Sequence, residues 1–134
     1  KDLFDSFIVA HEFGRENSQA LVNKTLQKAA QNEKVTTELL LHSDQGYQYT
    51  SQAYFALIRH YPITPSMSRR GNCWDNAPME SFFGHFKEEA FRQVRTPSFE
   101  EARYIIDDYI YFYNYERIQL KSRQTPFEIR CLSL

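Results

Sequence analysis

Residues 71–87 are Gly71-Asn72-Cys73-Trp74-Asp75-Asn76-Ala77-Pro78-Met79-Glu80-Ser81-Phe82-Phe83-Gly84-His85-Phe86-Lys87. Asp75 or Asn76 can cap the start of a helix here, and Pro78 suits the first turn, where no N–H is needed. The apolar residues that follow recur with the spacing of one helical face: Met79, Phe82, Phe83, Phe86 and Ala90. The segment therefore predicts an amphipathic helix.

Two charged residues lie along this predicted helix. Glu80 and Lys87 are seven residues apart, which is close to two helical turns, so they fall on nearly one line. Gly84 lies between them. A carboxylate, a glycine and a lysine in this order form a surface suited to facing a phosphate.

The composition is that of one ordinary domain. The chain has 134 residues, of which 42% are hydrophobic and 25% are charged, so it is long enough to bury a core. The formal net charge is −1 and both halves are close to neutral, so any surface for nucleic acid must come from local clustering. Cys73 and Cys131 have no nearby Cys or His partner, which argues for reduced thiols. No apolar run approaches the roughly 20 residues of a membrane span and no signal peptide is present, so we expect a cytoplasmic protein.

The rest of the chain predicts strands early and helices late. The expected elements are a hairpin over 3–4 and 7–13, a helix over 17–32, a buried strand over 35–41, a helix from 50, a short strand at most over 62–65, a loop over 66–74, and helices after Ser98 and Thr125. Ser98 with Glu101 forms a capping box. This order is typical of an α/β protein with a mixed or parallel sheet flanked by helices.

Asp44 and Glu80 are the acidic residues best placed to converge. Asp44 follows the predicted strand ending at Leu41, and chemistry in such sheets lies at the carboxyl ends of the strands. Two carboxylates suit Mg²⁺ or Mn²⁺, and a pair of such ions can clamp the oxygens of a phosphoryl transfer. That chemistry usually needs a third carboxylate, because two divalent ions carry four positive charges.

Each of these residues also has an ordinary structural interpretation. An aspartate after a strand is more often a turn former or helix cap, and a glutamate in a first helical turn complements the helix dipole. Lys87 by default is a solvated lysine, and Trp74 is a hydrophobic lid over the core. Taken singly, none of these residues establishes a site.

Taken together, two segments resemble a known family. His42-Ser43-Asp44-Gln45-Gly46-Tyr47-Gln48-Tyr49-Thr50-Ser51 and residues 68–83 resemble the segments around the second catalytic aspartate and the catalytic glutamate of bacterial insertion-sequence transposases. These enzymes have a core like that of retroviral integrases. There are 35 residues between Asp44 and Glu80, which is the spacing of this Asp-Asp-Glu family. Residues 113–117 and Thr125-Pro126 resemble its C-terminal signature.

The resemblance implies a ribonuclease-H-like fold and a metal-dependent transposase. Asp44 and Glu80 are expected to be catalytic and to bind Mg²⁺ or Mn²⁺, and two ions are expected in the full-length protein. Lys87 matches the family's basic residue that contacts DNA near the cleavage site. The expected partners are the ends of a mobile element, its target DNA and further copies of the chain. Candidate contacts to the DNA backbone are Lys87, Arg69, Arg70 and Asn76, with Arg117, Lys121 and Arg123 as weaker ones.

The chain departs from the family at its start. In the family, the first catalytic aspartate lies on a first strand, upstream of the segment that resembles residues 1–5. Asp2 and Asp5 match the family's second strand and the turn after it. We therefore expect one integrase-like domain over residues 1–134 that is truncated at its N-terminus, lacks its first strand and is catalytically inactive. We also expect it to dimerise or exchange elements to cover the exposed sheet edge.

Three other functions stay open. A nuclease or resolvase of the same fold would hydrolyse DNA without joining it, and a non-catalytic module would only bind DNA or assemble. A two-carboxylate glycosidase is less favoured, because it has no need of Lys87 or a basic loop.

Overall fold

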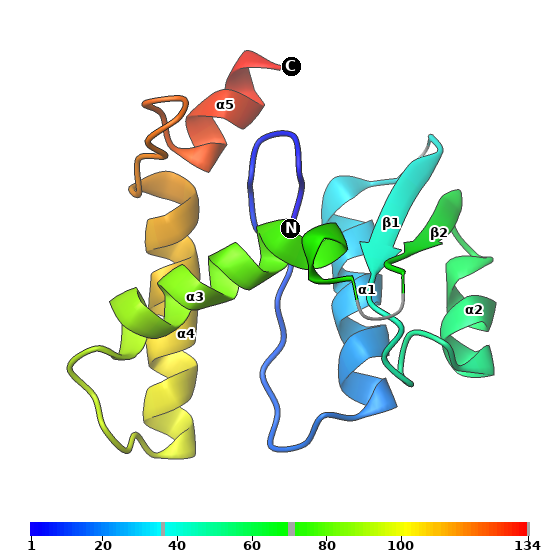
Figure 1. Cartoon of the computed structure of the whole chain (residues 1–134), viewed down its shortest axis with the longest axis horizontal. Coiled ribbons are helices and arrows are strands. Elements are labelled where there is room, and N and C mark those ends of the chain that lie inside the picture. The colour runs from blue at the N-terminus through cyan, green and yellow to red at the C-terminus, as the bar shows by residue number, and fades with distance from the viewer. Residues whose placement is uncertain (36, 70–71, 134) are drawn as a thin grey trace. The chain divides into compact units, whose positions relative to one another are not determined.

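The computed structural model describes residues 1–35, 37–69 and 72–133. The chain forms two compact units (Figure 1). Unit 1 comprises Lys1–Val9 and Pro78–Leu134, and unit 2 comprises Ala10–Ala77. None of the helices in the described residues is both long and apolar enough to span a bilayer.

Unit 2 contains the strands. Its elements are α1 (Gln19–Glu33), β1 (Leu39–Ser43), α2 (Gln52–Ile58), β2 (Ile63–Met67) and a 3-10 helix (Cys73–Asn76). The two strands pair in parallel, from Leu39 opposite Ile63 to Ser43 opposite Met67. A buried cluster joins α1, α2 and β2: Leu26, Tyr54, Ile58 and Ile63. Ser18 and Ser51 cap α1 and α2.

Unit 1 contains α3 (Ala77–Phe91), α4 (Phe99–Tyr115) and α5 (Pro126–Leu132). Figure 1 shows α3 running obliquely past α4, with α5 beyond the end of α4. A largely aromatic core joins the N-terminal segment, α3 and α4, and consists of Ile8, Phe82, Tyr109, Ile110 and Tyr113. The predicted capping box of Ser98 and Glu101 is present, and Thr125 and Glu128 form a second one.

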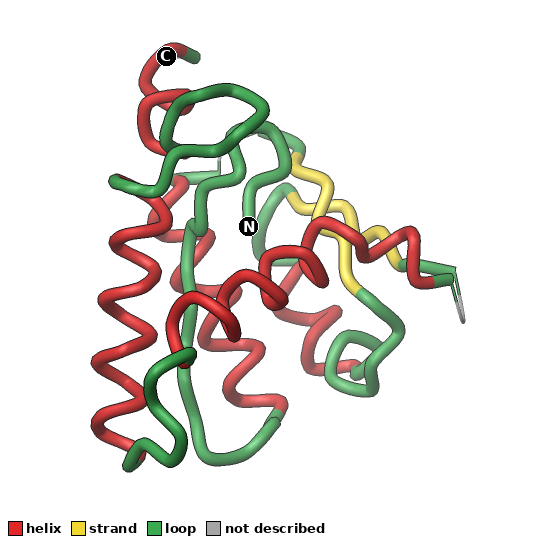
Figure 2. Tube along the Cα trace, turned by 60° about the vertical axis from the view of Figure 1, so that its left-hand side comes forward, coloured by secondary structure: helices red, strands yellow, loops and turns green. Residues whose placement is uncertain are grey.

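The predicted N-terminal hairpin is wrong, because residues 1–14 form no strand. They run as the turn 3–5 and a long extended segment (Figure 2). The Ile8 N–H donates to Asn114 Oδ1 over 2.8 Å, and Asn114 Nδ2 donates to the Ile8 carbonyl over 3.1 Å. One buried side chain on α4 thus satisfies the two backbone groups that a neighbouring strand would pair.

Several boundaries also differ from the prediction. The strand predicted over 35–41 is β1, which begins and ends later. It is not buried as predicted, because Leu39 and Leu40 are 42% and 66% exposed. Residues 66–67, predicted as loop, belong to β2. Asp75 and Asn76 do not cap α3, because they lie within the 3-10 helix, which Asn72 caps. Trp74 is 82% exposed and is not a lid over the core.

Candidate functional site

Asp44 directly follows β1 and is exposed. Its Oδ1 accepts a hydrogen bond of 2.7 Å from the Gly46 N–H, which forms a turn closed by the carboxylate. The negative charge of Asp44 adds to burial in raising the pKa of Tyr49. Asp44 therefore forms a turn, as the ordinary structural interpretation predicts. The same hydrogen bond holds its carboxylate in one orientation at the end of a strand.

Gly46 leaves the space that this turn needs. A Cβ atom on Gly46 would lie 2.8 Å from Asp44 Oδ1, which is closer than real Cβ contacts. The same Cβ would lie 3.4 Å from Gln48 Oε1 and 3.4 Å from Tyr49 Cδ2, so the exposed Asp44 carboxylate is the group that must move to make room for it.

If Asp44 is a metal ligand, as the sequence predicts, the Gly46→Ala substitution should displace its carboxylate and weaken divalent-ion binding by about tenfold or more, as the loss of an orienting partner does at other metal sites. Isothermal titration of the full-length protein with Mn²⁺ measures this affinity. The Tyr47→Ala variant, at an exposed neighbouring residue, is the matched control and should bind as the wild type does. Equal affinities in the wild type and Gly46→Ala would contradict the prediction.

Ser68 links the Asp44 turn to the 3-10 helix. Ser68 is 3% exposed, and its backbone N–H donates to the Ser43 carbonyl over 2.9 Å. The Ser68 carbonyl accepts from Gln45 Nε2 over 3.1 Å, and Ser68 Oγ accepts from Asn76 Nδ2 over 3.1 Å. This network fastens the end of β1 and its turn to the segment from which α3 starts.

Sequence reasoning missed the roles of Gln45 and Ser68, and it expected Asn76 to contact DNA. The amide nitrogen of Asn76 donates within the unit and its side chain is half-buried, and its contact to DNA stays a prediction. Both missed residues lie within the two segments that carry the family resemblance. Their position in those motifs was the available signal, but the pairing itself is a tertiary contact.

Arg69 is exposed, yet its guanidinium is paired. Its side chain is 79% exposed, while Nε lies 3.3 Å from Asp75 Oδ2 and NH2 lies 3.2 Å from Asp75 Oδ1. The Arg69 N–H also donates to Asp75 Oδ2 over 2.9 Å. These hydrogen bonds hold the pKa of Asp75 below its ordinary value, with the Arg69 side chain as the largest cause. Arg70, the other arginine predicted to contact DNA, lies outside the described residues.

The exposed face of α3 carries the second set of candidates. Glu80 lies in the first turn of α3, Lys87 lies about two turns later, and both are exposed. A Cβ atom on Gly84 would meet nothing within 4 Å, so packing does not require glycine at this position. Phe82 is buried on the other side of the helix, which confirms the predicted amphipathic pattern, although Phe83 is 47% exposed.

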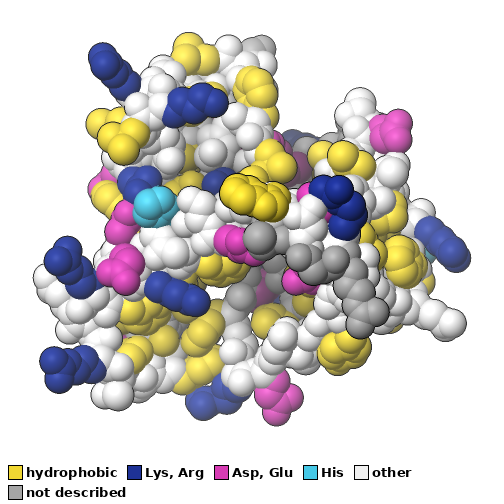
Figure 3. All heavy atoms as spheres, viewed as in Figure 1, with side chains coloured by type: hydrophobic (Ala, Val, Ile, Leu, Met, Phe, Trp, Pro, Cys, Tyr) yellow, Lys and Arg dark blue, Asp and Glu magenta, His cyan; other side chains and the backbone are white. Residues whose placement is uncertain are grey.

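The candidates are distributed over both units: Asp44, Arg69 and Asn76 belong to unit 2, and Glu80 and Lys87 belong to unit 1. Within the described residues, no group of three or more His, Cys, Asp and Glu side chains is arranged to hold a metal ion. In Figure 3, Lys and Arg side chains are scattered among Asp and Glu side chains, as the near-neutral composition predicts.

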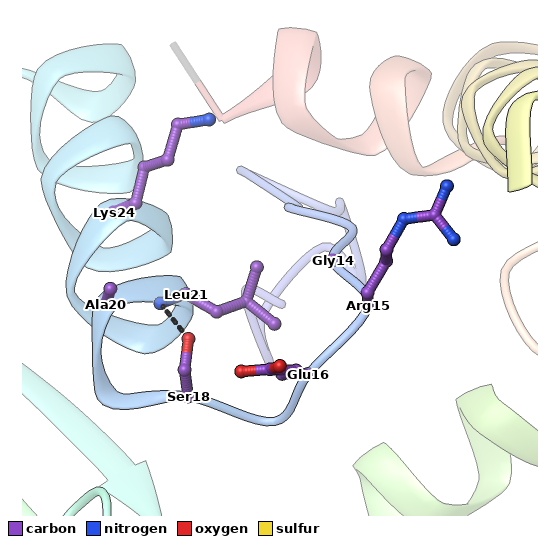
Figure 4. A pocket seen from close by; sticks show the side chains of 7 residues that line it. All are labelled: Gly14, Arg15, Glu16, Ser18, Ala20, Leu21 and Lys24. Carbon is purple, nitrogen blue, oxygen red and sulfur yellow. Dashed lines mark hydrogen bonds between the residues drawn. The ribbon is translucent and has the colours of Figure 1, made fainter.

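A shallow hollow of about 330 Å³ lies at the start of α1 (Figure 4). It is lined by Gly14, Arg15, Glu16, Ser18, Ala20, Leu21 and Lys24. The apolar side chain of Leu21 points into it, and Ser18 is engaged in capping α1. Neither Asp44 nor Glu80 lines this hollow, so it is separate from the candidate site.

Retroviral integrases share the fold of this chain. The HTLV-2 integrase catalytic core domain, determined in complex with magnesium in a trimeric form, matches 96% of this chain and 79% of its own, with a TM-score of 0.72 and 14% identity. The catalytic core domain of BIV integrase matches 96% of this chain and 80% of its own, with a TM-score of 0.71 and 22% identity. The predicted ribonuclease-H-like α/β fold is therefore confirmed.

Sequence comparison identifies the family. Two integrase core domain models match residues 1–73 and 80–134. An uncharacterized transposase-like protein of Haemophilus influenzae is 38% identical over 135 residues, which cover 100% of this chain and 62% of that protein. The putative transposase InsK for insertion sequence element IS150 of Escherichia coli is 35% identical, covering 96% of this chain and 46% of that protein. The chain thus spans less than two thirds of the length of these relatives. It belongs to the integrase core domain family, alongside the transposases of bacterial insertion sequences.

Proposed function

We propose that this chain is the catalytic core of a DNA transposase. The full-length protein would cleave the ends of a mobile element and join the freed 3′-OH to target DNA. The observation that carries the proposal is the placement of two exposed carboxylates in an integrase core fold. Asp44 lies directly after β1, and Glu80 lies in the first turn of α3.

Asp44 and Glu80 have the donor chemistry for Mg²⁺ or Mn²⁺. Mg²⁺ in phosphoryl-transfer sites is commonly held by one or two carboxylates together with waters and substrate phosphates. Gly46 supports this role, because its N–H holds one oxygen of Asp44 and orients the carboxylate. A further carboxylate of the full-length protein would complete the charge balance for two divalent ions. Bound divalent ions would act as Lewis acids toward the phosphate that is transferred.

The residues of α3 would position the DNA. Lys87 is an exposed cation that can hold a backbone phosphate as a point charge. Gly84, one turn before it, has no side chain and would let the DNA backbone approach the helix closely. A glycine inside an exposed helix costs about 1 kcal/mol relative to alanine, and packing does not require it here, so this approach would account for it. Arg69 is a second candidate, because a phosphate can replace Asp75 as the partner of its exposed guanidinium.

We also propose that the protein acts as a homo-oligomer in the bacterial cytoplasm. Within the described residues β1 pairs only with β2, so the other edge of each strand carries backbone groups without a strand partner. Leu39 and Leu40 on β1 are exposed as well. A further copy of the chain can cover such an edge by pairing with it or by exchanging an element.

A strand-transfer assay tests the proposed function. The full-length protein is mixed with labelled DNA that carries the element ends and an unlabelled target plasmid, with Mg²⁺ present. We expect cleaved and joined products, which disappear when EDTA removes the metal and return when Mn²⁺ is added. The isolated 134-residue chain serves as a second sample. We expect it neither to nick nor to join, because two carboxylates offset too little of the charge of two divalent ions.

The alternatives predict different products. Cleavage without joining would indicate a nuclease or resolvase. Binding of element ends without cleavage, at any divalent-ion concentration, would indicate a non-catalytic module. Full activity in EDTA would exclude a metal-dependent mechanism.

A further inference from the structure

Arg117 and Glu89 form a two-point ion pair in unit 1. Arg117 Nε donates to Glu89 Oε2 over 2.7 Å, and Arg117 NH2 donates to Glu89 Oε1 over 2.6 Å. The Tyr109 hydroxyl also donates to Glu89 Oε2, over 2.9 Å. The Arg117 and Glu89 side chains are 20% and 32% exposed, so the pair is partly shielded from water.

The pair connects two helices. Glu89 lies near the end of α3, two residues after Lys87, whereas Tyr109 lies on α4 and Arg117 follows the end of α4. The Arg117 guanidinium lies 5.7 Å from the ring centre of Tyr113, and the backbone N–H of Arg117 donates to the Phe112 carbonyl over 2.7 Å. Arg117 is therefore anchored on α4 from both its backbone and its side chain.

The other contacts between α3 and α4 lack this directionality. Phe82 packs against Tyr113 at 5.0 Å between ring centres, and Phe86 packs against Tyr109 at 5.3 Å. Such ring pairs prefer edge-to-face or offset arrangements, but this preference is weaker than that of a two-point ion pair, so they define the rotation and height of α3 less sharply. Two parallel hydrogen bonds between a planar guanidinium and a carboxylate have one favourable geometry.

We propose that Arg117 is a positioning residue for strand transfer and not a contact to DNA phosphate. Through Glu89 it holds α3 at one rotation and height on α4, and it thereby sets where the Glu80–Lys87 face lies. This inference rests on the proposed function, and it replaces the earlier assignment of Arg117 as a candidate for DNA binding.

The electrostatics of the pair agree with a lasting contact. The hydrogen bonds from Arg117 are the largest cause that lowers the pKa of Glu89, with a smaller contribution from Tyr109 and a minor one from His85. His85 Nδ1 lies 3.8 Å from Glu89 Oε1. The carboxylate is therefore ionised at neutral pH, when the pair must hold the helix.

The test compares Arg117→Gln, Glu89→Gln and the double variant in the full-length protein, with circular dichroism to establish that each is folded at the assay temperature. We expect each single variant to lower kcat for strand transfer by about a hundredfold, as small misplacements of catalytic groups do. The affinity for DNA and its salt dependence should not change. The double variant should be no slower than Arg117→Gln, because both ends of one interaction are removed.

Lys87→Gln is the matched control for a phosphate contact. It should reduce the slope of log affinity against log salt by about one. If Arg117→Gln reduces the slope by the same amount, Arg117 contacts phosphate and the proposal is overturned. If Arg117→Gln leaves kcat unchanged and lowers only the melting temperature, the pair is structural and the proposal is overturned as well.

Hydrogen exchange separates this inference from the proposed function. In the full-length protein, Arg117→Gln should raise amide exchange over residues 80–87 severalfold and leave α1 in unit 2 unchanged. If the wild type neither cleaves nor joins DNA, the proposed function fails while this measurement still judges the helix positioning. Unchanged exchange over residues 80–87 would overturn the positioning role.

Discussion

The Glu80→Gln variant of the full-length protein is expected to lose both DNA cleavage and strand transfer, with rates reduced by about a thousandfold or more. Glutamine keeps the size of the side chain but removes the charge that would hold a divalent ion in the proposed site. Metal catalysis of phosphate chemistry supplies several kcal/mol of transition-state stabilisation, and about 4 kcal/mol corresponds to a thousandfold in rate. Because Glu80 is exposed on α3, the substitution should not change folding.

The Glu88→Gln variant is the matched control. Glu88 is also exposed on α3, so this variant removes the same charge from the same helix and should retain activity. Asp44→Asn should be as inactive as Glu80→Gln, although an asparagine oxygen can still accept from the Gly46 N–H and keep the turn. Cleavage and joining rates are measured with labelled element ends in Mg²⁺. If Glu80→Gln cleaves and joins DNA at the wild-type rate, Glu80 is not needed for catalysis, which would favour the interpretation of this domain as a non-catalytic module.

The Arg130→Ala variant is expected to lower the free energy of unfolding of unit 1 by about 3–5 kcal/mol, the usual cost of leaving one charge of a buried pair unpaired. Asp5 is 3% exposed, and its Oδ2 accepts from Arg130 Nε over 2.6 Å. Arg130 also lies 3.2 Å from Asp2 Oδ2, and its guanidinium lies 4.3 Å from the ring centre of Phe7. This arginine on α5 thus holds the N-terminal turn in place.

Urea denaturation followed by circular dichroism measures this loss. Arg103→Ala removes an exposed arginine from α4 and should change stability by no more than about 0.5 kcal/mol. A variant that replaces both Arg130 and Asp5 with apolar residues should recover part of the loss, because no buried charge is then left unpaired. If Arg130→Ala costs less than about 1 kcal/mol, Asp5 gains access to water when its partner is removed, and the expected cost is wrong.

Local signals predicted the helices well. The cap at Ser98 was predicted because a cap bonds within three residues along the chain. The amphipathic α3 followed from apolar periodicity, and the positions of Asp44 after β1 and Glu80 in the first turn of α3 followed from the same kind of pattern. The family assignment also needed only the order and spacing of motifs.

The failures at the N-terminus and before α3 concern side-chain contacts that local patterns do not contain. The N-terminal residues have the alternation of a hairpin, but Asn114, 106 residues from Ile8, takes the place of the partner strand. Asp75 and Asn76 have the chemistry of helix caps, yet they bond to Arg69 and Ser68 within the loop before α3. The same type of side chain can cap a helix, form an ion pair or bind phosphate. The residue type alone therefore does not tell which of these roles it has.

The segment 71–87 shows both sides of this division. Its periodicity and motifs determined that α3 is amphipathic, that Glu80 and Lys87 share a line along it, and that the chain is an integrase core. Only the tertiary structure decided that Arg117, 28 residues from Glu89, holds the far end of that helix against α4. The apolar periodicity shows that a segment is helical and which side of the helix is apolar. The helix's rotation and height depend on which distant side chains meet it, and these are set by the packing of the whole unit.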